Sequence, residues 1–117
     1  MKQRETELQK ACIKWFRYAY PLYSQLLFHI PNGGKRNIIE AKKFKDLGVV
    51  AGVPDLFLSV AKHGYNGFFI EMKAPNGRLT ENQKEIIEKL RKENYKVSII
   101  NNLDLFIYEI SNYLKNK

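Results

Sequence analysis

In some segments of this chain, apolar residues recur at helical spacing. In other segments they form the alternating or continuous runs that are typical of strands. The helical pattern predicts helices over residues 4–20, over 37–48, beyond Thr80 and over 103–114. The runs predict strands over residues 23–30, 55–61, 67–73 and 96–100. The predicted order is therefore α-β-α-β-β-α-β-α, which indicates an α/β domain.

Local signals mark where several of these elements end. The turn-forming run Pro31-Asn32-Gly33-Gly34 stops the strand over 23–30. Gly48 is predicted to be the C′ residue of the second helix, a position that favours glycine. Thr80, with Gln83 three residues later, matches the capping box that begins a helix.

The two central strands, 55–61 and 67–73, sort their side chains by simple alternation. One face is wholly apolar and belongs to the core; it carries Leu56, Leu58, Val60, Phe68, Ile70 and Met72. Asp55, Glu71 and Lys73 share the opposite face once the apolar faces align. A three-residue turn at 63–65 would pair Phe57 with Glu71 and Asp55 with Lys73.

Charges inside a sheet are costly unless something compensates them. Two carboxylates suit Mg²⁺ or Mn²⁺, which accept one or two of them together with water and substrate phosphate. Lys73 beside such an ion can orient an attacking water and balance charge on a phosphate. The alternative reading is a structural Asp55–Lys73–Glu71 network on a half-exposed face of the sheet.

The composition is that of one folded domain covering residues 1–117. Hydrophobic residues make up 44% and charged residues 27%, which excludes a disordered chain. Cys12 is the only cysteine, so an internal disulfide and a cysteine-based zinc site are excluded. We expect no membrane association, because no apolar stretch approaches the ~20 residues of a membrane span, and no secretory signal, which makes the cytoplasm the expected location.

The charge balance favours a polyanionic partner. Lys and Arg number 20 against 12 acids, a net charge of +8. Much of the excess lies between residues 35 and 45, in Lys35, Arg36, Lys42, Lys43 and Lys45. We interpret this segment as a phosphate-binding surface; the alternative is a solvated helix face.

The spacing of Pro54-Asp55, fifteen residues and Glu71-Met72-Lys73 resembles the active-site signature of the PD-(D/E)XK nuclease superfamily. The flanks PNGGKR (31–36), AGVPDL (51–56) and FIEMKAPNGRLTENQ (69–83) make the resemblance more specific, to the VRR-NUC domain. That nuclease branch occurs in small stand-alone phage proteins and in a large eukaryotic DNA-repair nuclease. The resemblance implies a restriction-endonuclease-like core, with a mixed sheet flanked by helices.

The resemblance also implies roles for the residues of the strand pair. Asp55 and Glu71 would bind a divalent metal, with the backbone carbonyl of Met72 as a further ligand. Lys73 would be the catalytic lysine. Gln83 matches a glutamine at the edge of the family's site, and this role is compatible with its place in the capping box.

Further family positions fall in the first third of the chain. The family places a metal-site glutamate on the first helix, where Glu5 and Glu7 compete; we favour Glu5, which lies on the side leading to the core. Asn32, Gly33, Gly34 and Arg36 match a segment whose backbone N–H groups can approach a phosphate; the alternative is an ordinary turn. His29 invites a general-base role, but we interpret it as structural.

The predicted function is therefore a metal-dependent DNA endonuclease that uses Mg²⁺ or Mn²⁺. By resemblance, stand-alone members cut branched DNA such as four-way (Holliday) junctions as homodimers, because symmetric cutting needs two sites. If the chain is phage-encoded, it would act in the host cytoplasm. The alternatives are a non-catalytic basic DNA-binding module with the same fold, and a structural partner protein with a salt-bridged sheet.

Overall fold

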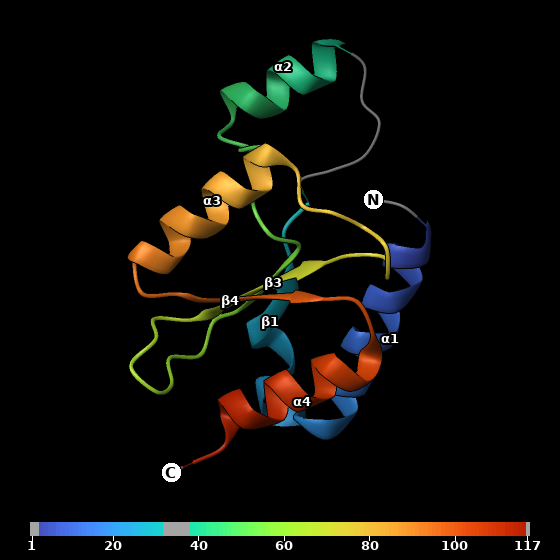
Figure 1. Ribbon diagram of the computed structural model, residues 1–117, viewed down its shortest axis with the longest axis vertical. Coiled ribbons are helices and arrows are strands. Elements are labelled where there is room, and N and C mark those ends of the chain that lie inside the picture. Colours follow the sequence, from blue (N-terminus) through green and yellow to red (C-terminus); the bar gives the residue numbers. More distant parts are fainter. Residues whose placement is uncertain (1–2, 32–37, 117) are drawn as a thin grey trace.

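The computed structural model describes residues 3–31 and 38–116 of the chain. The elements of these residues follow one another as drawn in Figure 1. They are α1 (Gln3–Ala19), the 3₁₀ helix η1 (Pro21–Leu26), β1 (Leu27–His29), α2 (Ile38–Asp46), β2 (Leu56–Leu58), β3 (Phe68–Met72), α3 (Glu81–Lys92), β4 (Lys96–Ile100) and α4 (Leu103–Leu114). No helix in the described ranges is long and apolar enough to cross a membrane.

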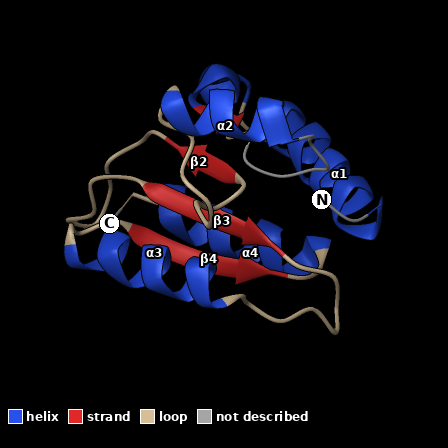
Figure 2. Ribbon diagram, turned by 90° about the horizontal axis from the view of Figure 1, so that it is seen from above, coloured by secondary structure: helices blue, strands red, loops and turns tan. Residues whose placement is uncertain are grey.

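The strands form one mixed sheet in the order β1-β2-β3-β4. The pairs β1–β2 and β2–β3 are antiparallel, whereas β3 and β4 are parallel and are joined through α3. Figure 2 shows the sheet between its helices, with β3 and β4 side by side. The predicted α/β class and mixed sheet flanked by helices are confirmed.

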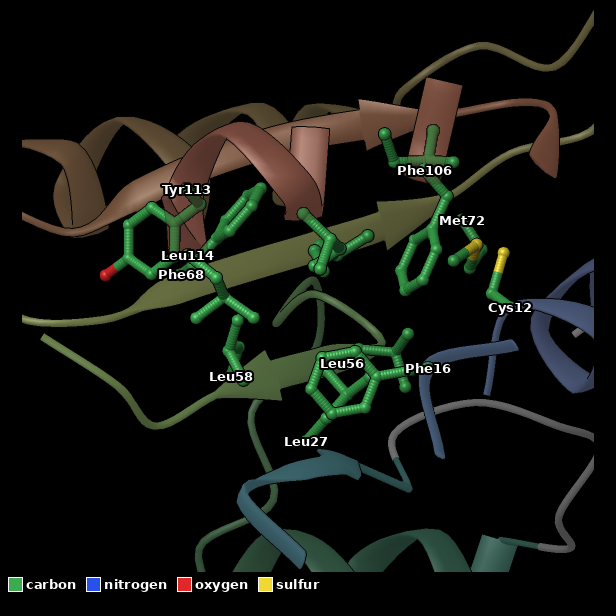
Figure 3. Close-up of a cluster of buried hydrophobic side chains, with 13 residues drawn as sticks. Cys12, Phe16, Leu27, Leu56, Leu58, Phe68, Met72, Phe106, Tyr113 and Leu114 are labelled. Atoms are coloured by element: carbon green, nitrogen blue, oxygen red, sulfur yellow. The ribbon is translucent and has the colours of Figure 1, made fainter. Parts of the chain in front are cut away.

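The core lies between one face of the sheet and the helices α1 and α4 (Figure 3). Its largest fully buried side chains come from α1, the sheet and α4, and include Phe16, Phe68, Phe106, Leu56, Leu58, Ile70, Met72 and Ile110. Burying one such side chain contributes about 1.5–3 kcal/mol, so this face fixes how the strands lie on α1 and α4. The alternation expected for the central strands is therefore confirmed on its apolar side.

The strand predicted over residues 23–30 is mostly wrong. Residues Pro21–Leu26 form η1, and only Leu27–His29 pair with β2. Proline is well tolerated in the first turn of a helix, and the backbone N–H of Tyr23 donates to the carbonyl of Tyr20 at 3.0 Å. Leu22 is 95% exposed, so the apolar run here is not a buried strand.

The central strands are shorter than predicted, and their pairing differs by two residues. His63 and Gly64, both at positive φ, form a two-residue turn closed by the bridge between Lys62 and Tyr65. Between that bridge and the first pair of the β2–β3 ladder, the β2 side has one more residue than the β3 side. Phe57 therefore pairs with Phe69 rather than Glu71. A shift of two keeps every side chain on its predicted face.

Several predicted helix ends are confirmed. Gly48 (φ +100°) is the C′ residue of α2: its N–H donates to Lys45 at 3.0 Å, and that of Val49 donates to Phe44 at 2.9 Å. Thr80 and Gln83 form the predicted capping box of α3. The bounds of β4 and α4 agree with the predicted 96–100 and 103–114. The predicted start of α2 at Asn37 lies outside the described residues.

Candidate active site

A pocket of about 340 Å³ opens where α1, the end of β1, the segment before β2, β3 and the start of α3 meet. Its polar lining includes Glu5, His29, Asp55, Glu71 and Gln83. Of the predicted metal-site carboxylates, Glu5, Asp55 and Glu71 are therefore brought to one cavity, although Glu5 is fifty residues or more away along the chain.

Asp55 is positioned by the pairing of the two central strands. Leu56 pairs with Ile70, so extending the ladder by one pair places Asp55 beside Glu71, and not beside Lys73 as predicted. The backbone N–H of Met72 donates to Oδ2 of Asp55 at 2.7 Å. Asp55 thus bonds across to the strand that carries Glu71, and the two carboxylates meet at the pocket.

Glu71 is a carboxylate in the interior of the sheet, only 3% exposed. Its Oε2 accepts a hydrogen bond from Nε2 of Gln83 at 3.1 Å and lies 3.9 Å from Nζ of Lys73. Its Oε1 is buried and has no hydrogen-bond partner among the described residues. A buried acceptor without a partner is costly, so this oxygen is poised to bind a cation.

The two carboxylates disfavour each other's charge. Burial, and then the negative charge of Asp55, raise the pKa of Glu71 to about 8. Burial also raises the pKa of Asp55, against the opposing effect of the Met72 N–H bond. Near neutral pH the pair therefore retains a proton, shared in a side-chain hydrogen bond between Glu71 and Asp55, and a divalent cation would displace it.

A divalent ion fits Asp55 and Glu71, with the Met72 carbonyl as the further predicted ligand. Among the described residues, no group of three or more His, Cys, Asp or Glu side chains could hold a metal ion by itself. Mg²⁺ needs only one or two carboxylates and completes its shell with water and substrate phosphates. The unpartnered Oε1 of Glu71 is the observation that favours an ion here.

The first helix offers one carboxylate to the pocket. Oε2 of Glu5 accepts a hydrogen bond from the backbone N–H of Ala74 at 3.2 Å, just beyond the end of β3. Glu7 is exposed and pairs with Lys10 at 3.5 Å on the surface. The structure thus brings Glu5, and not Glu7, to the pocket; its role as a metal ligand stays a prediction.

Gln83 makes both of the contacts considered from sequence. Its Oε1 accepts from the Thr80 N–H at 2.9 Å, and its own N–H donates to Oγ1 of Thr80 at 3.2 Å. Its Nε2 meanwhile donates to Glu71. The capping box of α3 therefore orients the amide that holds the buried carboxylate.

Lys73 lies beside the carboxylates but does not line the pocket. Its side chain is 12% exposed, and Nζ is 3.9 Å from Oε2 of Glu71. The sheet holds its backbone, whose N–H donates to the carbonyl of Ile100 at 2.9 Å. Lys73 is not among the residues that line the cavity, so it reaches the site through Glu71.

Among the pocket residues that were not predicted as site residues, His29 and Gly52 contact the backbone that carries the site. His29 lines the cavity, with Nδ1 2.9 Å from the carbonyl oxygen of Asp55; sequence could suggest this only through the strand that carries it. Gly52 (φ +93°) lies so close to α3 that a Cβ would be 2.6 Å from the carbonyl oxygen of Asn82. The glycine-punctuated loop before Asp55 was its only signal.

Three of the predicted nucleic-acid-binding residues are described, and they lie outside the pocket. Lys42, Lys43 and Lys45 are exposed on α2, which stands apart from the sheet in Figure 1, and none of them lines the pocket. Lys42 pairs with Asp46 at 3.1 Å. The other predicted residues of this group, Asn32, Gly33, Gly34, Lys35 and Arg36, lie outside the described residues.

Comparison with known proteins gives one consistent result. Residues 2–102 match the VRR-NUC domain. A solved structure described as a "VRR_NUC domain protein" superposes with a TM-score of 0.83 at 33% sequence identity, covering 97% of this chain and 90% of that one. Nothing among the curated proteins matches.

Proposed function

Because the chain belongs to the VRR-NUC domain family, a nuclease-like family, we propose that it is a divalent-metal-dependent deoxyribonuclease that hydrolyses phosphodiester bonds. The observation that carries the proposal is Glu71, a buried carboxylate with one unpartnered oxygen, next to Asp55 in a pocket. A purely structural sheet would gain by replacing such a pair with apolar residues. A site that binds a cation explains why the pair is there.

The residues of the pocket then take distinct roles. Asp55, Glu71 and the Met72 carbonyl would hold Mg²⁺ or Mn²⁺, and the ion when bound supplies electrostatic stabilisation of the charge on the phosphate. Gln83 fixes the orientation of the Glu71 carboxylate. Glu5 closes the side of the pocket formed by α1.

Lys73 supplies the positive charge that belongs to the chain itself. Its ammonium group lies 3.9 Å from Glu71 and is largely shielded from solvent, which strengthens its field at the site. We propose that Lys73 favours the charged carboxylate and stabilises negative charge that develops on the phosphate.

DNA is the proposed substrate because the chain carries a net charge of +8. The exposed lysines of α2 present part of that charge to solvent. Binding of this kind is largely independent of base sequence and weakens steeply with salt.

We further propose that the enzyme is a homodimer acting on branched DNA such as four-way junctions, since symmetric cutting needs two sites. Large exposed apolar side chains support a protein interface: Ile39 on α2 is 81% exposed, and Leu47 directly after α2 is 71% exposed. The mass in solution tests the dimer. A wild-type mass of one chain would overturn this part of the proposal, and Leu47→Glu should convert a dimer to monomer.

Cleavage of a labelled panel of four-way junction, flap, duplex and single strand, with Mg²⁺ or Mn²⁺, tests the activity. Lys73→Ala should lower the rate by about 10²-fold or more, the range for loss of one stabilising group. Lys96→Ala is the matched control, since Lys96 is a lysine of the sheet that also pairs with a partly buried glutamate, Glu109 of α4, at 3.7 Å. Binding without cutting in every lane would overturn the proposal and leave a DNA-binding module.

A further inference from the structure

His29 ends β1 and turns one ring nitrogen toward the backbone of the site. Its Nδ1 lies 2.9 Å from the carbonyl oxygen of Asp55. That oxygen also accepts the N–H of Ile30 at 2.8 Å, a bond that continues the pairing of β1 with β2. A carbonyl can only accept, so Nδ1 must carry the proton.

The neighbouring amide agrees with this tautomer. The Gln9 side chain approaches the same Nδ1 at 3.1 Å, and its Oε1 is buried with no partner among the described residues. An amide can present either end to a neighbour. Turned by 180°, Gln9 offers Nδ1–H a second acceptor, and its amide N–H groups then take the place of the unpartnered oxygen.

A neutral imidazole protonated at Nδ1 is an acceptor at Nε2. No hydrogen bond to Nε2 is formed by the part of the chain that the structure describes, and the ring lines the pocket beside Asp55 and Glu71. A phosphodiester has no proton to donate to this nitrogen, but a water molecule has two. Lys73, the other candidate for handling water, does not line the cavity.

We propose that Nε2 of His29 accepts a hydrogen bond from the water that attacks the phosphodiester, which makes His29 a further catalytic residue. The inference rests on the proposed nuclease function. The Asp55 carbonyl, which also pairs β1 with β2, sets the orientation of the His29 ring. The pairing of the strands therefore determines where the ring holds the water molecule. Misplacing a reacting group by about 1 Å can cost 10²-fold in rate.

Two substitutions separate the nitrogens. His29→Asn keeps a donor at the place of Nδ1 and removes Nε2, whereas His29→Gln keeps an acceptor at the place of Nε2 and loses the bond to Asp55. Both are measured with wild type and Lys73→Ala for single-turnover cleavage at saturating DNA, for DNA affinity and for thermal stability. Rates are compared at equal folded fraction.

We expect His29→Asn to bind DNA as wild type does and to cut about 10²-fold more slowly, with His29→Gln faster than His29→Asn. If His29→Asn cuts as fast as His29→Gln or faster, His29 acts only through the Asp55 carbonyl, and the inference is overturned. Weaker DNA binding by His29→Asn at an unchanged saturating rate would indicate a phosphate contact and would also overturn it. Absence of cleavage by wild type would instead refute the nuclease function.

Discussion

Glu71 concentrates the energetics of the site in one side chain. It is buried in the sheet; Gln83 holds one of its oxygens, and the other has no partner in the parts of the chain that the structure describes. The nearby charge of Lys73 lowers its pKa, but burial and Asp55 outweigh this effect. The side chain is therefore unfavourable in the metal-free fold at the pH where a nuclease works.

This imbalance predicts the pH dependence of the metal-free protein. The pKa of Glu71 is about 8 when folded and 4.5 in its ordinary state, so the folded state binds more protons between these values. The free energy of unfolding should be highest below pH 4.5 with respect to this group and should fall as pH rises through 8. Urea unfolding in EDTA from pH 5 to 9 measures it.

Glu71→Gln is the control, because it has no proton to lose. It should remove most of the fall and leave the variant more stable than wild type at pH 8. Wild-type stability that rises over this range, or an unchanged pH profile in the variant, would contradict the assignment.

At this scale, alternation along the strands predicted that Asp55, Glu71 and Lys73 share a face, and the structure agrees. It could not predict which of them meet, because pairing depends on the turn at His63-Gly64 and on one extra residue beyond it. The side chains stay on their predicted faces only because the shorter turn and the extra residue each shift the pairing by one, which makes a shift of two.

The segment before β2 and the first turn of α3 together form one wall of the pocket. Gly52 packs on the backbone of Asn82 and Gln83, and Gln83 in turn holds Glu71. Their close approach ties the loop that carries Asp55 to the helix that orients its partner.

Two glycines test this contact. Gly48 and Gly52 both have positive φ, but a Cβ at Gly48 meets open space. Gly48→Ala should cost about 1–2 kcal/mol through backbone strain alone, and Gly52→Ala about 1–3 kcal/mol more through overpacking. Only Gly52→Ala should also slow cleavage. Urea unfolding measures the stability of each variant, and cleavage rates measure its activity. If both variants lose the same free energy of unfolding, the contact of Gly52 with α3 is loose.

Helices and strands were predictable where the signal is local. The capping box of α3 and the C′ glycine of α2 are set by side chains within a few residues. The segment over 21–26 was predicted wrongly, because its apolar run favours a strand, whereas Pro21 and the bond from Tyr23 to Tyr20 begin the 3₁₀ helix η1, which has no buried residue. The pocket's link from α1 to β3, through Glu5 and Ala74, spans 69 residues and has no local signal.

For the whole molecule, the separation of charge is the main feature. The candidate catalytic acids meet in one pocket, whereas α2 carries exposed lysines away from it. The two surfaces suit two tasks, since a cation site should not repel the metal and a DNA surface should attract phosphate.

Lysine contacts can be counted from the salt dependence of DNA binding. If Lys42 contacts a phosphate, Lys42→Ala should reduce the slope of log affinity against log salt by about 0.9. Lys92→Ala is the matched control: both lysines are about three-quarters exposed and pair with an acid four residues away on a helix. Equal slopes for the two variants would exclude a specific role for Lys42.

Metal-linked stability tests the central claim most directly. Mn²⁺ at a hundred times its dissociation constant should add about 2.7 kcal/mol to the free energy of unfolding of wild type. Glu71→Gln should lose that gain. Glu109→Gln, which alters the partly buried pair between Glu109 of α4 and Lys96 of β4, should keep it. No gain in wild type, or an equal gain in Glu71→Gln, would contradict a metal centre built on Asp55 and Glu71.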